Sequence, residues 1–127
     1  MTRAARRARR LAAALLALAP VAAPVAGEAT FDQYLQAFRR ALAADDRVAL
    51  ASLTQLPFLY EGRGLDASGF RQAIPELFTP AVRRCLAQAR PIAEDDRYVL
   101  FCSPYGFYFG RTADGYRLIE FMADGEE

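Results

Sequence analysis

The chain has 127 residues, 54% of them hydrophobic, and its 16 basic residues, all arginine, stand against 15 acidic ones. Five arginines and no acidic residue lie in residues 1–27, so the remainder carries a formal net charge of −4, from eleven arginines and fifteen acids. A mildly acidic domain with no lysine and no basic cluster lacks the positive surface that nucleic-acid binding requires, so that class of function is excluded.

Residues 1–27 have the pattern of a secretory signal peptide. A basic segment, MTRAARRARR, precedes an uncharged apolar segment, LAAALLALAPVAAPVA. The apolar segment is shorter than the roughly 20 residues of a membrane-spanning helix, and Pro20 and Pro24 interrupt its end, so we predict cleavage rather than a retained anchor. The cut falls before Glu28 or after Ala29. We therefore expect an exported protein, periplasmic or secreted, with no membrane attachment after cleavage.

The exported part is predicted to form one domain. About 100 residues remain after cleavage, enough for one modest hydrophobic core and too few for two. No internal repeat divides them. We assign the domain to residues 28–123 and expect residues 124–127 to form a flexible acidic tail.

Two paired helices are predicted to open the domain. Thr30 and Gln33 have the spacing of a capping box, and apolar residues recur at helical spacing from Phe31 to about Ala44. Asp45 or Asp46 then caps a shorter helix that ends at Pro57. The apolar surface of this second helix is expected to comprise Val48, Ala51, Leu53 and Leu56.

A short strand and two more helices follow. Phe58–Glu61 reads as the strand, and Gly62 and Gly64 permit a sharp reversal after it. Asp66 or Ser68 caps the third helix, in which Pro75 predicts a kink or an early end. Thr79 and Pro80 have the N-cap and first-position pattern of a fourth helix, with Cys85 on its inner side. The inward residues of the third helix are expected to be Phe70, Ile74, Leu77 and Phe78.

The chain closes with a predicted antiparallel meander. Three strands, 97–103, 107–111 and 116–122, are separated by the reversing segments 104–106 and 112–115. Alternation puts Tyr98, Leu100 and Cys102 on one face, and Leu118, Glu120 and Met122 together on one face of the last strand. Aromatic residues occupy both faces of the meander. The outer face is therefore expected to pair with a second subunit or to border a pocket.

Cys85 and Cys102 are the only cysteines. In an exported protein a disulfide between them is the default, and two free buried thiols are the alternative. The chain has no histidine and no C-x-x-C motif, so a metal site or redox pair is disfavoured. The run Glu94-Asp95-Asp96 could hold calcium, but three adjacent acids are typical of a solvated loop. We expect no metal and no cofactor.

Two segments, LPFLYEGRGLDASGFRQAIPELFTPAVRRCL and GFYFGRTADGYRLIEF, together with the order of the elements, resemble the nuclear-transport-factor-like (NTF2-like, SnoaL or cystatin-like) cone superfamily. The resemblance is to its small, exported, uncharacterised members and spans roughly residues 31–121. It implies an α+β fold in which N-terminal helices pack on a curved antiparallel sheet around a conical cavity. It also implies a homodimer formed through the outer side of the sheet.

The superfamily includes both binding modules and enzymes, so the resemblance alone does not fix a function. Because no nucleophile–base pair is evident, we expect a non-catalytic module that binds a small apolar ligand or a partner protein. The alternative is a small isomerase or lyase, which needs a carboxylate of raised pKa in an apolar cavity beside a phenol. The first candidate for the carboxylate is Glu120, and the second is Glu61. The alternative for Glu120 is an exposed strand residue or a partner for Arg117 or Arg111. Candidate ligand-binding phenols are Tyr60, Tyr98 and Tyr108.

Overall fold

The computed structural model describes residues 30–123. The predicted signal peptide and acidic tail lie outside the described residues. Helices precede a set of antiparallel strands, so the α+β class is confirmed. The elements are α2 (Phe31–Ala43), α3 (Arg47–Ser52), β1 (Phe58–Tyr60), β2 (Arg63–Leu65), α4 (Ala67–Leu77), α5 (Pro80–Leu86), β3 (Ile92–Glu94), β4 (Arg97–Cys102), β5 (Tyr105–Thr112) and β6 (Gly115–Ala123).

The predicted helix starts are confirmed by their caps. The Thr30 hydroxyl accepts a hydrogen bond from the Gln33 amide at 3.1 Å, and the Thr30 amide donates to the Gln33 side chain at 3.0 Å. Asp46, Asp66 and Thr79 cap α3, α4 and α5 in the same way, each accepting from the amide three residues on. These bonds satisfy backbone donors that a helix start otherwise leaves unpaired.

The helix α3 is shorter than the sequence predicts. It ends at Ser52 rather than Pro57, and Val48, expected to pack inward, is 70% exposed. The chain beyond α3 instead pairs with β6. The amide of Gln55 donates to the carbonyl of Leu118 at 2.8 Å, and the amide of Leu118 donates to the carbonyl of Leu53 at 3.0 Å. These tertiary hydrogen bonds replace the helical ones that the sequence pattern favoured.

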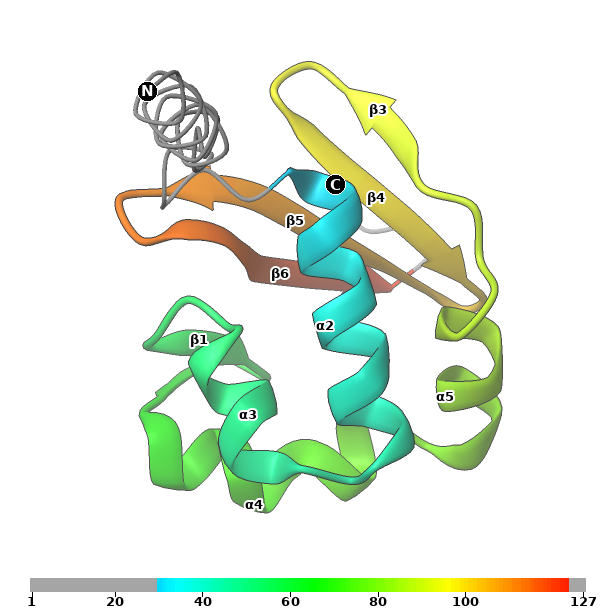
Figure 1. Ribbon diagram of the computed structural model, residues 1–127. Helices are drawn as coiled ribbons and strands as arrows, with labels where there is room; N and C mark the ends of the chain where they lie inside the picture. The colour runs from blue at the N-terminus through cyan, green and yellow to red at the C-terminus, as the bar shows by residue number, and fades with distance from the viewer. Residues whose placement is uncertain (1–29, 124–127) are drawn as a thin grey trace, which may run out of the picture.

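The main sheet has four antiparallel strands in the order β3-β4-β5-β6, and α2 crosses one of its faces (Figure 1). The predicted meander is thus confirmed, but the sequence missed β3, which pairs with β4 through a turn at Asp95 and Asp96. It also missed β2, which contains Gly64 and pairs with β1. Tyr105, predicted to lie in a turn, begins β5. Only Ser103 and Pro104 separate β4 from β5.

A β-bulge overturns the predicted faces of the last strand. Tyr108 pairs with Glu120, but the next residue, Phe109, pairs with Leu118, so Ile119 is an extra residue in β6. Leu118 therefore faces the helices and is fully buried, whereas Glu120 faces outward. Simple alternation had placed the two on one face, which is wrong.

The inner face of the sheet forms the core together with the helices. Leu100 and Cys102 are buried on it, as predicted, and the disulfide between Cys85 and Cys102 joins α5 to β4 with an S–S distance of 2.07 Å. The predicted inward residues of α4, Phe70, Ile74, Leu77 and Phe78, are all buried. Within residues 30–123, no helix combines the length and the apolar character needed to cross a bilayer.

Candidate functional site

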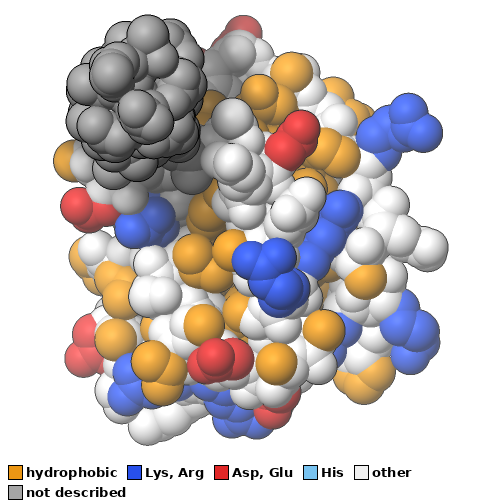
Figure 2. Space-filling model, in the orientation of Figure 1, with side chains coloured by type: hydrophobic (Ala, Val, Ile, Leu, Met, Phe, Trp, Pro, Cys, Tyr) orange, Lys and Arg blue, Asp and Glu red, His pale blue; other side chains and the backbone are white. Residues whose placement is uncertain are grey.

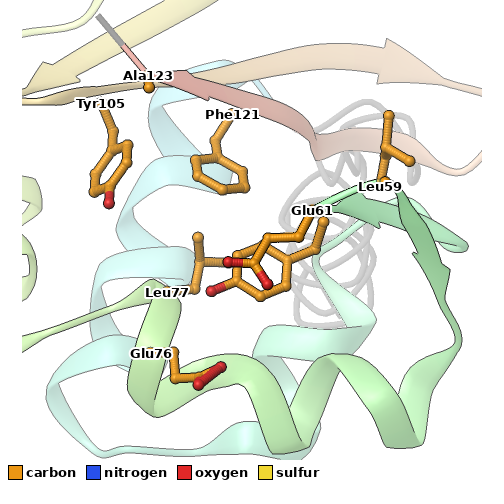
Figure 3. Close-up of a pocket in the computed structure, with 9 residues that line it drawn as sticks. Leu59, Glu61, Glu76, Leu77, Tyr105, Phe121 and Ala123 are labelled. Carbon is orange, nitrogen blue, oxygen red and sulfur yellow. The ribbon is translucent and has the colours of Figure 1, made fainter.

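A cavity of about 370 Å³ opens where the β1–β2 turn, the end of α4 and the strands β5 and β6 meet (Figure 3). Tyr105 and Phe121 extend from the sheet toward the cavity, while Glu61 and Glu76 approach it from the opposite side. The complete lining comprises Leu59, Tyr60, Glu61, Gly62, Glu76, Leu77, Tyr105, Phe121 and Ala123. The candidate residues Tyr60 and Glu61 thus share this cavity.

Aromatic rings form one wall of the cavity. The Phe121 ring centroid lies 5.6 Å from that of Tyr60 and 5.5 Å from that of Tyr105. Phe121 also stacks on Phe58 and Phe107 behind it, at 6.0 and 5.9 Å. The wall is therefore anchored in the hydrophobic core and presents preformed apolar surface at the cavity.

Glu61 is held at the cavity by the hairpin turn between β1 and β2. The turn between β1 and β2 places Glu61 at φ 51° and Gly62 at φ 78°. Positive φ at both central residues is the pattern of a type I′ hairpin turn, which favours Asn-Gly. A glutamate in this region costs conformational energy because its Cβ crowds the backbone. The fold thus carries a carboxylate at the cavity in a position better suited to asparagine or glycine.

The cavity is acidic. Both charged side chains that line it, Glu61 and Glu76, are exposed carboxylates. The pKa of Tyr60 is raised above its ordinary value, first because burial disfavours the phenolate and then because Glu61, Glu76 and Tyr105 repel it, while Arg63 acts in the opposite direction. The phenol therefore stays protonated and can donate a hydrogen bond.

Glu120 does not line this cavity. It lies on the outer face of the sheet, where its carboxylate oxygen is 3.5 Å from a guanidinium nitrogen of Arg97. The same guanidinium lies over the ring of Tyr108, 4.2 Å from its centroid. Glu120 and Tyr108 are therefore neighbours in a half-buried cluster on the outer face of the sheet, away from the cavity that Glu61 lines.

Tyr98 lies on the inner face but away from the cavity, half-buried in a cluster of aromatic rings. Its ring stacks on Phe31 with the centroids 4.0 Å apart and meets Tyr116 edge-on at 6.2 Å. Phe31, at the start of α2, covers it. The three tyrosines that the sequence proposed as one group thus occupy three separate environments, and only Tyr60 lines the cavity.

The sequence did not identify Tyr105, Phe121 or Glu76 as cavity residues. Tyr105 was assigned to a turn, although its spacing from Phe107 and Phe109 places all three on one face once β5 begins at residue 105. Phe121 was not assigned to a side of the sheet, because that depends on the register and the bulge of β6. Glu76 is the penultimate residue of α4, and nothing in the local pattern distinguishes it from a solvent-facing acid.

No metal site is found among residues 30–123, in the sense that no three acidic or cysteine side chains are grouped as ligands. In the predicted acidic run, Glu94 instead pairs with Arg97 at 3.2 Å. On the helical face of the molecule, acidic and basic side chains are interspersed among apolar ones (Figure 2).

No family model, no curated protein and no solved structure matches this chain.

Proposed function

We propose that this chain is a non-catalytic binding module that takes a small apolar ligand into the cavity bordered by Tyr60, Tyr105 and Phe121. The observation that carries the proposal is the cavity itself, whose volume of about 370 Å³ and aromatic wall suit a ligand of modest size. Its few polar groups, two carboxylates and two phenols, would orient the ligand rather than transform it.

The order of elements supports an NTF2-like cone as the framework of this module. The helix α2 lies against the inner face of an antiparallel sheet (Figure 1). The cavity is lined from that sheet by β5 and β6 and from the other side by β1, the β1–β2 turn and the end of α4. In this proposal, the aromatic residues on the inner face of the sheet line the cone, and Phe121 lies at its open end.

The residues of the cavity favour binding over nucleophilic catalysis. The chain contains no histidine, both cysteines form the disulfide, and no serine or threonine lines the cavity. The lining therefore lacks the serine, threonine, cysteine and histidine side chains that usually form the activated nucleophile and its base in acyl transfer or hydrolysis.

The second candidate function is a small isomerase or lyase that uses Glu61 as general base. One observation favours it: Glu61 shares the cavity with the phenols of Tyr60 and Tyr105, which could hold a developing oxyanion. In that case Glu61→Gln abolishes turnover of a carbonyl substrate, whereas Glu120→Gln on the outer face leaves turnover intact. Tight binding without turnover in the unchanged protein supports the binding module instead.

The binding proposal is tested with 2-phenylethanol, a small neutral probe, by NMR titration. We expect saturable binding that Ala123→Trp abolishes, because the indole fills the mouth of the cavity. Ala113→Trp, in the exposed β5–β6 turn, is the matched control and should leave binding unchanged. Equal binding by both variants, or no saturable binding at all, would contradict the proposal.

We also propose that the protein is exported and that its outer sheet face forms a homodimer. The disulfide is compatible with an oxidising compartment, and Phe101 and Ile92 leave apolar surface on that face, 51% and 49% exposed. Export predicts recovery of the disulfide-bonded protein from the periplasm or medium after cell fractionation.

The homodimer has its own test. Sedimentation should detect a dimer that Phe101→Glu dissociates, while Val48→Glu, on exposed α3, leaves it intact.

A further inference from the structure

We propose that the ligand of this cavity is an organic cation, a protonated amine or quaternary ammonium carried on an apolar body. This rests on the proposed function and specifies the charge of the ligand. Three features of the described residues lead to it: the charges of the lining, the rings of its wall and the accessible hydroxyl of Tyr60.

The charged groups of the lining are all acidic. Glu61 and Glu76 approach the cavity from the side opposite Tyr105 and Phe121 (Figure 3). Within residues 30–123 neither carboxylate forms an ion pair, although four ion pairs are present elsewhere. The nearby Arg63 lines a neighbouring groove and not this cavity. Glu76 also lines that groove, and the charge of Arg63 reaches Tyr60, but a cation entering the cavity would meet two carboxylates that form no ion pair among the described residues.

The rings of the wall suit the same kind of ligand. Tyr60, Phe121 and Tyr105 follow one another with centroid separations of 5.6 and 5.5 Å. Aromatic faces attract ammonium groups through the ring quadrupole, and clustered rings with nearby carboxylates are the arrangement that binds methylated or alkyl ammonium groups. An apolar body would at the same time replace water against Leu77 and Phe121.

Tyr60 supplies a phenol whose ring is buried and whose hydroxyl is accessible at the cavity. Its side chain is 8% exposed, and its hydroxyl has no hydrogen-bond partner among the described residues. Because no fully buried side-chain oxygen there lacks a partner, this hydroxyl must open onto the cavity. The carboxylates contribute to raising the pKa of Tyr60, which indicates that their negative potential reaches it. The hydroxyl oxygen can therefore accept a hydrogen bond from an ammonium group.

The outer face of the sheet provides an internal comparison. There a carboxylate and a phenol ring, those of Glu120 and Tyr108, hold the guanidinium of Arg97, at 3.5 Å from the carboxylate and 4.2 Å from the ring centroid. The cavity combines the same two chemical groups, but no arginine lines it. In the cavity, a cationic ligand would take the role that the Arg97 guanidinium has on the outer face.

The test uses three probes that share a benzyl body and differ in charge: 2-phenylethylammonium, 2-phenylethanol and phenylacetate. In calorimetric titrations at neutral pH and low salt, we expect the ammonium to bind roughly tenfold more tightly than the alcohol and phenylacetate to bind most weakly. The preference for the ammonium should fall as salt is added, because salt screens exposed charges.

Variants test whether the two cavity carboxylates cause the preference for the ammonium. Glu61→Gln and Glu76→Gln together should lower the affinity for the ammonium to that for the alcohol, while the affinity for the alcohol stays within about twofold. Glu120→Gln removes an equal charge outside the cavity and should change neither. Equal affinity of the unchanged protein for the ammonium and the alcohol overturns the inference but leaves the binding module intact. Failure of all three probes to bind overturns both.

Discussion

The inner face of the sheet has two ends with similar residues and different surroundings. At one end Phe31, in the first turn of α2, stacks on Tyr98, and Tyr116 meets both rings edge-on. At the other end the Phe121 ring contacts those of Tyr60 and Tyr105, with centroids 5.6 and 5.5 Å away, and all three residues border a cavity. We call these the closed end and the open end of the aromatic layer.

What covers each group of aromatic residues decides whether the group packs as core or borders the cavity. Phe31 covers the closed end because Thr30 caps α2, which makes Phe31 the first residue of the helix. At the open end the nearest cover is the β1–β2 turn, which brings Glu61 and Gly62 rather than a large apolar side chain. A carboxylate in water leaves the rings beneath it accessible.

The largest expected effect separates the two ends directly. Phe31→Ala removes a buried ring from the closed end and should lower the free energy of unfolding by about 3–5 kcal/mol, as for other buried phenylalanines. Phe121→Ala removes a half-buried ring and should cost about 2 kcal/mol. Urea denaturation measures both. Phe121→Ala should also lose binding of 2-phenylethanol, whereas a folded Phe31→Ala should keep it; the reverse pattern would contradict the assignment of the ends.

The disulfide should contribute the next largest effect. It holds β4 at Cys102, whose cross-strand partner is Tyr105 at the open end. With a sequence separation of 17, replacing both cysteines by serine should cost about 3 kcal/mol in the loop-entropy model. Denaturation of the variant and of the reduced protein measures this. A loss below about 1 kcal/mol would mean that packing alone holds α5 to the sheet.

A smaller effect is expected from Tyr34, beside the closed end. Its hydroxyl donates to the carbonyl of Leu53 at 2.6 Å, so Tyr34→Phe should cost about 1–2 kcal/mol. Burial raises the pKa of Tyr34 in the folded state above its ordinary value, so only the unfolded chain readily loses this proton. Stability from this group is therefore full below about pH 10 and falls as the pH rises further.

The matching measurement is denaturation at rising pH. Tyr34→Phe should flatten part of the alkaline decline, and the rest is expected from Tyr60, whose pKa is raised in the same direction. An unchanged pH slope in Tyr34→Phe would contradict the buried phenol. Tyr116→Phe is a useful control because it alters a tyrosine of the same cluster without removing that hydrogen bond.

The smallest effect concerns the turn at the open end. Glu61→Asn places a residue that tolerates positive φ where the structure has φ 51°, and should raise the free energy of unfolding by about 0.5 kcal/mol. The same change removes a cavity carboxylate and should weaken binding of 2-phenylethylammonium. Higher stability with lower affinity would indicate that the glutamate serves the ligand rather than the fold. Lower stability with unchanged affinity would contradict this role.

Local signals in the sequence predicted much of the fold. The caps at Thr30, Asp66 and Thr79 depend on residues only three positions apart. The disulfide was predicted from the expected compartment and the presence of two cysteines, without knowledge of distant contacts. The meander was predicted because its strands are long and rich in aromatic residues. The short strands β2 and β3 were missed because three residues carry too little periodicity to detect.

The candidate site was predicted only in part, because it depends on register. Tyr60 and Glu61 were identified next to a glycine turn, but Tyr105 and Phe121 reach the cavity through the pairing of β5 with β6. The bulge at Ile119 exchanges the faces of the residues on either side of it, which moved Glu120 outward and Phe121 inward. An insertion of one residue in a ladder has no clear signature in a single sequence.

The most direct test is to map where 2-phenylethylammonium binds by following the amide and aromatic NMR signals of the whole domain during a titration. Saturable shifts are expected around Tyr60, Glu61, Tyr105 and Phe121, with the signals of Phe31, Tyr98 and Tyr116 unchanged. Shifts centred on the closed end or on the outer face, or no saturable shift anywhere, would contradict the claim that the open end is the binding site.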